Sequence, residues 1–259
     1  MTTVLALANQ KGGVGKTTTA INLGAALASR GHSILIIDID PQANATAGLG
    51  MRAPSGASTY ELLLEERALA EVAHSTQFEH LFVVPASADL AGAEVELTAV
   101  MAREFRLKRA IEGEIDSYQF VIVDCPPSVG LLTVNALTAA DEVIVPVQCE
   151  YLALEGLGQM MDTLERVRRN LNRQLRLRGL LLTMYDRRTN LSQQVAEEVR
   201  SHFPSTFRTV IPRSVRLSEA PSHGLPISAY DPASAACAAY DALAGEVLEA
   251  VGATVEVTL

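Results

Sequence analysis

The chain has 259 residues, of which 48% are hydrophobic and 20% are charged, a composition typical of ordinary globular proteins. We predict a single domain over residues 1–259, because no Pro/Ser-rich or single-sign stretch marks a linker. No apolar run reaches the roughly 18 to 20 uncharged residues that a membrane span requires, and no signal-type segment opens the chain. The three scattered cysteines form no CxxC pair, which favours reduced thiols and a cytoplasmic location.

Short apolar runs alternate with helix-like segments, which is typical of a parallel sheet covered by helices on both faces. Strands are predicted at Val4–Asn9, Ser33–Asp38, Leu81–Pro85, Phe120–Cys125, Glu142–Val147, Arg178–Met184, Phe207–Ile211 and Ile227–Tyr230. Helices are predicted at Lys16–Ser29, Leu157–Leu171, Leu191–Phe203 and Ala233–Val251. The expected fold is therefore α/β, a doubly wound, mostly parallel sheet whose ligand lies beyond the carboxyl ends of the strands.

A glycine-rich loop follows the first predicted strand, with the sequence Lys11-Gly12-Gly13-Val14-Gly15-Lys16-Thr17-Thr18. Glycines let backbone N–H groups point at a polyphosphate, and the start of the next helix favours negative charge. Lys16 is expected to reach the β- and γ-phosphates of a nucleotide, and the Thr17 hydroxyl to ligate Mg²⁺. The usual first glycine of the motif is Gln10 here, so the loop is a variant form. A turn without a ligand is the alternative, but two of the three lysines of the chain lie in this loop.

Carboxylates end two of the predicted strands. Four apolar residues lead into Asp124, which we expect to hold Mg²⁺ through a water molecule. Asp38 and Asp40 follow another apolar run. If these strands are neighbours of the first one, their polar ends converge on the glycine-rich loop.

Charge is unevenly distributed along the chain. The formal net charge of −9 argues against a nucleic-acid partner. Between Met160 and Ala220, however, twelve arginines and no lysine face six acidic residues. This segment has an excess of positive charge that suits phosphate contacts, with a solvated arginine-rich surface as the alternative.

Several long motifs resemble the deviant Walker A ATPases, and within them the chromosomal ParA/Soj partition ATPases. The motifs are Asn9–Thr18, Asp38–Asn44, Asp124–Ser128, Pro146–Tyr151, Leu182–Asp186, Thr189–Leu191 and Ile211–Pro221. The resemblance runs from Thr3 to about Ala250. It implies a Mg²⁺-dependent ATP hydrolase that forms a homodimer with ATP sandwiched between the subunits.

The resemblance also implies roles for individual residues. Lys11 is similar to the signature lysine that reaches the nucleotide of the opposite subunit, and Gly12 would lie where two subunits approach. Asp40 is similar to the residue that positions the attacking water, close to the metal. The nucleotide site would comprise Lys11, Gly12, Gly13, Val14, Gly15, Lys16, Thr17 and Thr18, with Met184, Pro212 and Arg213 at the adenine. The catalytic set would be Lys11, Lys16 and Asp40, and the metal set Thr17, Asp40 and Asp124.

For partners, the resemblance implies nonspecific double-stranded DNA and a ParB-type centromere-binding protein that stimulates slow hydrolysis through a short basic N-terminal segment. Arg188 and Arg216 match the DNA-contacting positions of the family best, with Arg187 and Arg213 beside them. Four further arginines are candidates to extend this patch: Arg166, Arg168, Arg169 and Arg173. The expected location is the cytoplasm, on the nucleoid, without membrane attachment.

Two other classes of function compete with this hypothesis. A MinD-type membrane-positioning ATPase needs a basic amphipathic C-terminal helix, and residues Val251–Leu259 contain no basic residue. An iron-protein reductase needs two cysteines per subunit at a dimer axis, and a P-loop ligase or kinase needs a substrate pocket. Cys125, which directly follows the Asp124 strand, is expected to be buried.

Overall fold

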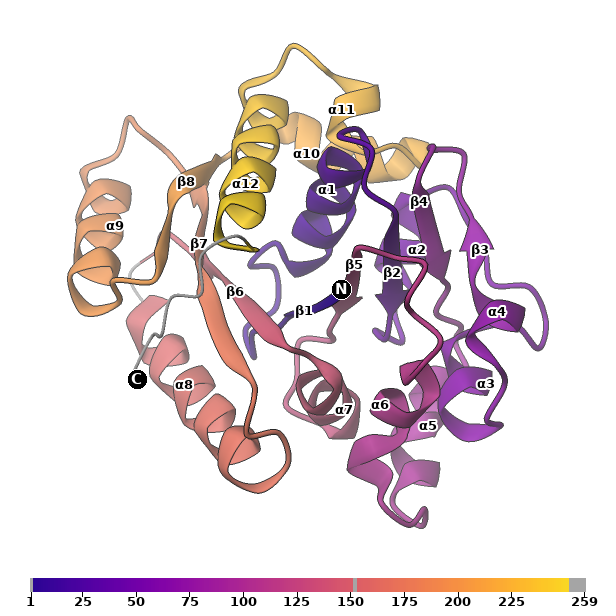
Figure 1. Ribbon diagram of the computed structural model, residues 1–259. Coiled ribbons are helices and arrows are strands. Elements are labelled where there is room, and N and C mark those ends of the chain that lie inside the picture. Colours follow the sequence, from indigo (N-terminus) through magenta and orange to yellow (C-terminus); the bar gives the residue numbers. More distant parts are fainter. Residues whose placement is uncertain (1, 151–152, 252–259) are drawn as a thin grey trace.

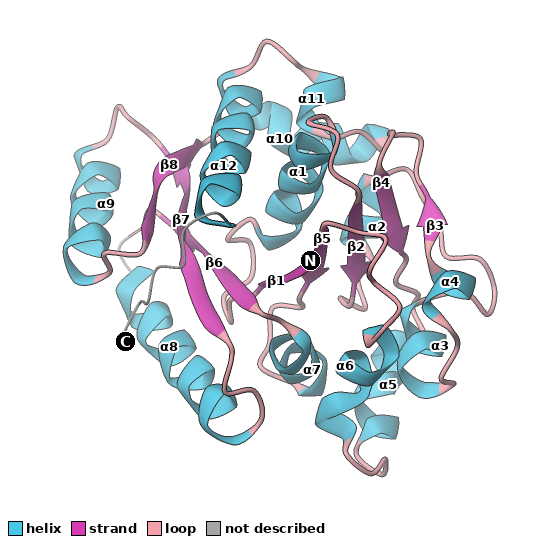
Figure 2. Ribbon diagram, in the orientation of Figure 1, coloured by secondary structure: helices cyan, strands magenta, loops and turns pink. Residues whose placement is uncertain are grey.

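The computed structural model describes residues 2–150 and 153–251. Eight strands form one sheet in the order β3-β4-β2-β5-β1-β6-β7-β8 (Figures 1 and 2). Their bounds are β1 Thr3–Leu7, β2 Ile34–Asp38, β3 His74–Ser75, β4 Leu81–Val84, β5 Phe120–Asp124, β6 Glu142–Gln148, β7 Arg176–Tyr185 and β8 Thr206–Pro212. Every neighbouring pair is parallel except β3 and β4. The predicted doubly wound, mostly parallel sheet is confirmed.

Helices cover both faces of the sheet (Figure 1). Apolar side chains of α1, α2, α10, α11 and α12 pack on one face, and those of α3 to α9 on the other. Their bounds are α1 Lys16–Ala28, α2 Asn44–Gly48, α3 Thr59–Leu64, α4 Leu69–Val72, α5 Leu90–Leu97, α6 Arg106–Ile111, α7 Leu131–Ala139, α8 Ala153–Asn170, α9 Asn190–His202, α10 Val215–Glu219, α11 Ile227–Tyr230 and α12 Ala235–Val251. The four predicted helices correspond to α1, α8, α9 and α12.

The eighth predicted strand, Ile227–Tyr230, is wrong, because this segment is the single helical turn α11. The carbonyl oxygen of Pro226 accepts hydrogen bonds from the N–H groups of Ala229 and Tyr230, both at 3.0 Å. The N–H of Ile227 donates to the Asn22 side chain at 2.7 Å and so docks the turn on α1. A β-branched residue and an aromatic one in a four-residue run do not distinguish a buried strand from a buried turn.

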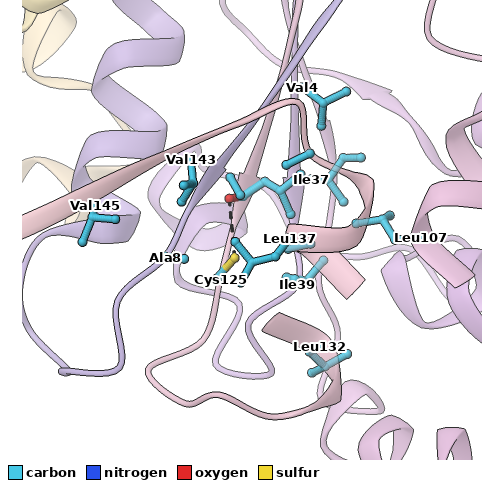
Figure 3. Packing of buried hydrophobic residues seen from close by; sticks show 14 of the residues in the cluster. Val4, Ala8, Ile37, Ile39, Leu107, Cys125, Leu132, Leu137, Val143 and Val145 are labelled. Atoms are coloured by element: carbon cyan, nitrogen blue, oxygen red, sulfur yellow. Dashed lines mark hydrogen bonds between the residues drawn. The ribbon is translucent and has the colours of Figure 1, made fainter. Parts of the chain in front are cut away.

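The hydrophobic core continues to the carboxyl ends of the central strands. Figure 3 shows Ala8, Ile39 and Cys125 among the packed side chains of one core cluster. All three residues are fully buried. Burial raises the pKa of the Cys125 thiol, which lies 3.9 Å from the carbonyl oxygen of Val123. The loops that leave these strands therefore start from a tightly packed base.

None of the helices in residues 2–150 and 153–251 combines the length and apolar character of a membrane-crossing helix. Two segments used in the sequence analysis lie outside the described ranges. One is Tyr151, the last residue of a motif that resembles the family, and the other is the tail after Val251, on which the membrane-anchor alternative depends.

Candidate nucleotide site and arginine surface

The glycine-rich loop joins β1 to α1 at the carboxyl edge of the sheet. Gly13 and Gly15 adopt φ angles of 73° and 91°, in the left-handed region that glycine accepts without strain. Helix α1 then begins at Lys16, with no side-chain cap and no acidic residue in its first turn. Its first N–H groups and the positive end of its dipole are therefore available to an anion.

Two polar side chains, those of Asn9 and Thr183, hold the backbone of this loop in place. Asn9 accepts from the N–H of Lys11 at 3.0 Å and donates to the carbonyl oxygen of Pro146 in β6 at 2.7 Å. Thr183 of β7 donates to the carbonyl oxygen of Val14 at 2.8 Å. Sequence reasoning did not assign Thr183 to the site. A polar residue at the end of an apolar strand was the available signal.

Gln10, which replaces the usual first glycine, ties the loop to α8. Its side-chain amide nitrogen donates to the carbonyl oxygen of Gln159 and to the hydroxyl of Thr163, both at 3.2 Å. A glycine at this position has no such side chain. The variant residue therefore supplies a contact between the loop and the middle of α8.

The two lysines of the loop point to different surroundings. Lys16 is only 6% exposed, and its ammonium donates to the carbonyl oxygen of Lys11 at 3.2 Å. Burial lowers the pKa of Lys16, while the negative charge of Asp124 acts in the opposite direction. The ammonium of Lys11 lies instead 3.8 Å from the Glu150 carboxylate, on a side chain that is 39% exposed. One lysine is thus directed into its own loop and the other toward the surface.

Gly12 has room for a side chain within the chain itself. A Cβ atom built there meets only the Cβ of Pro127, at 3.7 Å, which is an ordinary van der Waals contact. Gly12 is exposed, and its φ angle lies outside the left-handed region. The described part of the chain therefore gives no reason for glycine at this position.

Asp124 is a fully buried carboxylate at the carboxyl edge of the sheet. It lies at the end of β5, directly opposite Asp38 on β2 and Leu7 on β1. It is fully buried, and neither of its oxygens has a hydrogen-bond partner among the described residues. Burial raises its pKa well above the ordinary value, and the charge of Asp38 adds to the shift. Thr17 and the positive charge of Lys16 act in the opposite direction. Buried carboxylate oxygens without partners suit a cation such as Mg²⁺.

Asp38 accepts more hydrogen bonds than Asp40. Asp38 accepts from the N–H of Asp40 at 3.1 Å and from the N–H and hydroxyl of Thr46 at 2.8 and 2.7 Å. Burial raises the pKa of Asp38 to about 6. Asp40 is 5% exposed and accepts from the N–H of Gln42 at 2.9 Å. Asp38 therefore has a structural role in holding the Asp40 segment, a role that sequence reasoning missed.

The residues expected at the adenine lie on adjacent strand ends. Tyr185 of β7 pairs with Pro212 of β8, and the N–H of Arg213 donates to the carbonyl oxygen of Tyr185 at 3.1 Å. Met184 adopts a φ angle of 51°, which is uncommon for a residue with a side chain. These positions share the carboxyl edge of the sheet with the glycine-rich loop.

Four of the arginines lie at this same edge. Arg187 and Arg188 follow the end of β7, Arg213 follows β8, and Arg216 belongs to α10, directly after β8. All four are exposed. The four further candidates lie apart from these arginines, because α8 leads back from the end of β6 toward the start of β7. Arg166, Arg168 and Arg169 lie in its last turns and Arg173 in the loop that follows, toward the amino edge, since 18 helical residues span about 27 Å.

Comparison with known proteins decides between the classes of function. A family model described as an AAA domain matches residues 2–177. The sporulation initiation inhibitor protein Soj of Bacillus subtilis is 54% identical over 246 residues, which are 94% of this chain and 97% of that protein. The chromosome partitioning protein ParA of Caulobacter vibrioides is 53% identical over 249 residues, 95% of this chain and 93% of that protein.

The chain belongs to the Soj/ParA family of chromosome-partitioning ATPases.

Solved structures agree with this P-loop fold. Cobyrinic acid a,c-diamide synthase from Mycobacterium smegmatis, with bound ATP analog and magnesium, is 38% identical, with a TM-score of 0.85 and coverage of 99% and 98% of the two chains. The septum site-determining protein MinD of Pyrococcus horikoshii, complexed with Mg-ADP, is 25% identical, with a TM-score of 0.80 and coverage of 99% and 100%. The MinD likeness is weaker than the likeness to Soj/ParA proteins, so partitioning is the better-supported class.

Proposed function

We propose that this Soj/ParA-family chain is an ATP-switched dimer that binds DNA without sequence preference. ATP joins two copies across their nucleotides, the dimer binds DNA, and slow hydrolysis releases it. The observation that carries the proposal is the arrangement of the two loop lysines. Lys16 already serves the loop of its own subunit, whereas Lys11 is directed away from it toward Glu150. A second nucleotide, bound by another copy, gives Lys11 a phosphate to contact.

The nucleotide would bind along the loop Lys11–Thr18, with its phosphates against the first turn of α1 and the Lys16 ammonium. Met184, Pro212 and Arg213 would contact the adenine. Thr17 and Asp124 would hold Mg²⁺, with Asp40 close by, and the orphaned oxygens of Asp124 fit this role. Bound there, the metal neutralises charge on the phosphate oxygens. Two structural neighbours, at 38% and 25% identity, contain a nucleotide and magnesium, which supports the assignment.

Asp40 would position the water that attacks the γ-phosphate. Its backbone is fixed by the Asp38 carboxylate, and its own Oδ1 accepts from Gln42. A carboxylate beside the γ-phosphate also repels it, which is consistent with slow turnover. A ParB-type partner with a short basic segment would accelerate the reaction.

The open space at Gly12 supports the dimer. Since the chain itself leaves room for a Cβ there, a close approach of a second subunit would explain the glycine. For DNA, we assign Arg188 and Arg216, with Arg187 and Arg213, as phosphate contacts. Dimerisation doubles these contacts, so ATP raises the affinity for DNA and places the protein on the nucleoid.

The test uses Asp40→Ala, which should bind Mg²⁺–ATP normally but hydrolyse it very slowly. Size-exclusion chromatography with light scattering should show a monomer with ADP, a dimer with ATP, and the dimer bound to a DNA duplex. Lys16→Ala is the control and should stay monomeric because it loses nucleotide binding. An Asp40→Ala protein that stays monomeric with saturating Mg²⁺–ATP, in solution and on DNA, would refute the switch.

The same samples separate the competing functions. A MinD-type output predicts ATP-dependent co-sedimentation with anionic liposomes, whereas the partition function predicts binding to DNA only. A ligase or reductase predicts little turnover until its acceptor is added. ATP hydrolysis by a colourless protein without any small-molecule acceptor excludes both.

A further inference from the structure

Arg188 is held by a carboxylate of its own turn. Asp186 Oδ1 accepts from both the backbone N–H and the Nε of Arg188 at 3.0 Å, and its Oδ2 accepts from a terminal guanidinium nitrogen at 2.8 Å. Two N–H groups of the guanidinium are therefore in use although the side chain is 87% exposed. The hydrogen bonds from Arg188 lower the pKa of Asp186 to about 2, with a smaller contribution from the charge of Arg213. Asp186 is thus ionised under all ordinary conditions.

Arg216 has the same kind of restraint. One terminal nitrogen of its guanidinium lies 3.0 Å from Glu219 Oε2, and its Nε lies 3.6 Å from the carboxylate of Asp231. The guanidinium also lies over the Tyr230 ring, 5.8 Å from its centroid. The Tyr230 hydroxyl donates to the same Glu219 oxygen at 3.1 Å, so the tyrosine fixes the carboxylate beside the arginine.

A DNA phosphate and these carboxylates compete for the same donors. Arginine pairs with a carboxylate or a phosphate through the same planar fork of N–H groups. A phosphate that contacts Arg188 or Arg216 must therefore displace the acidic neighbour or accept weaker geometry. Exposed ion pairs are weak, so a phosphate can replace the carboxylate, but breaking the ion pair reduces the net affinity for DNA.

We propose that Asp186 and Glu219 act as built-in competitors of DNA phosphate, each occupying an arginine of the DNA-binding surface and thereby lowering its affinity. The inference rests on the proposed function and concerns the same surface. It explains how a chain with a strongly basic segment avoids binding DNA as a monomer. Two arginines restrained in each subunit bind weakly, and four in a dimer bind usefully.

The test replaces the competitors while keeping their shape. Asp186→Asn retains an acceptor for the N–H of Arg188, and Glu219→Gln retains one for the Tyr230 hydroxyl. Each change should tighten binding of the ATP-loaded Asp40→Ala dimer to a DNA duplex by about twofold to fivefold at moderate salt. The ADP-loaded monomer should also gain measurable binding, and both are read by fluorescence anisotropy.

Two controls separate competition from a general loss of negative charge. Glu197→Gln removes one charge from α9, from an exposed residue that pairs with no described arginine, and should change affinity by less than either variant. A double-mutant cycle is decisive: in an Arg188→Gln background, Asp186→Asn should have almost no effect. An equal gain in that background, or no gain in the parent, overturns the inference. Failure of the parent dimer to bind DNA at all would instead reject the proposed function.

Discussion

At the scale of single residues, Asp124 combines full burial with the absence of a described hydrogen-bond partner. A carboxyl group whose pKa is raised in the folded state binds protons more readily there than in the unfolded chain. Between its ordinary value of 3.8 and the raised value, stability therefore falls as the pH rises. Above that window the unliganded protein bears the cost of a buried charge, which the nearby Lys16 ammonium offsets only in part.

Asp124→Asn should therefore stabilise the unliganded protein relative to the parent. It should also reduce the stabilisation that Mg²⁺–ATP gives. Burying a neutral amide costs less than burying a charge, and we expect a rise in Tm on the order of 5 °C at pH 7.5. The rise should shrink as the pH falls, because Asp124 itself becomes protonated. Calorimetry should also show that Mg²⁺–ATP no longer raises Tm as it does in the parent. A lower Tm for the unliganded variant at pH 7.5 would contradict this account.

At the scale of elements, the contact between the glycine-rich loop and α8 depends on one side chain. Gln10→Ala removes two hydrogen bonds, each worth about 1 kcal/mol, from a partly exposed position. We expect up to a tenfold loss of nucleotide affinity with little change in Tm, because the loop becomes less ordered while the core is untouched. Titration calorimetry with ATP measures the loss.

Gln159→Ala is the matched control for this contact. Gln10 bonds the backbone carbonyl of residue 159 and not its side chain, so the control should bind nucleotide like the parent. Equal losses in both variants would show that α8 itself, and not the tether, was disturbed.

The sequence predicted the central strands and the long helices well. β1, β2, β5 and β6 lie inside a parallel sheet, so they are continuous apolar runs whose ends are easily recognised. The short helices between β2 and β5 have only four to eight residues, too few for a helical period to show. The strand predicted at Ile227–Tyr230 was wrong for the same reason, since α11 has only four residues.

The candidate site was predictable to the same extent. Asp40 and Asp124 follow recognisable apolar runs, and Lys16 ends a recognisable glycine-rich loop, so the sequence alone placed them at one edge of the sheet. Thr183 and the α8 partners of Gln10 were not found, because their roles depend on which strands and helices become neighbours, and sequence does not state that order.

At the scale of the whole molecule, counting charge along the chain overstated the basic surface. Arg176 and Arg178 pair with Glu142, and Arg208 pairs with Glu246 and Glu249. These glutamates lie far away in sequence, on β6 and α12. The four arginines that we propose as DNA contacts, Arg187, Arg188, Arg213 and Arg216, lie at the carboxyl edge of the sheet.

Charge reversal at the two edges tests this placement. Arg188→Glu combined with Arg216→Glu should abolish DNA binding by the ATP-loaded dimer, because four phosphate contacts become repulsive, while dimerisation persists. Arg166→Glu combined with Arg173→Glu makes the same change in charge at the amino edge and should leave most of the affinity intact.

Anisotropy titrations over a range of salt concentrations measure both effects. The parent should lose affinity steeply with salt, by roughly 0.9 in the log–log slope for each phosphate contacted. A nearly flat salt dependence in the parent, or equal losses from both pairs of reversals, would remove the arginines from this role.

All of the proposed binding residues lie at the carboxyl edge of the sheet, so a fluorescent dye can be attached at the amino edge. Glu114 is exposed in the turn between α6 and β5, at the amino edge, while Cys125 and Cys149 are buried and Cys237 is partly covered. Glu114→Cys, combined with Cys237→Ser, would allow a dye to be attached at the amino edge. The proposed nucleotide and DNA sites lie at the opposite, carboxyl edge. The residence time of the protein on stretched DNA can then be measured by single-molecule imaging, without a fluorophore between the protein and the DNA.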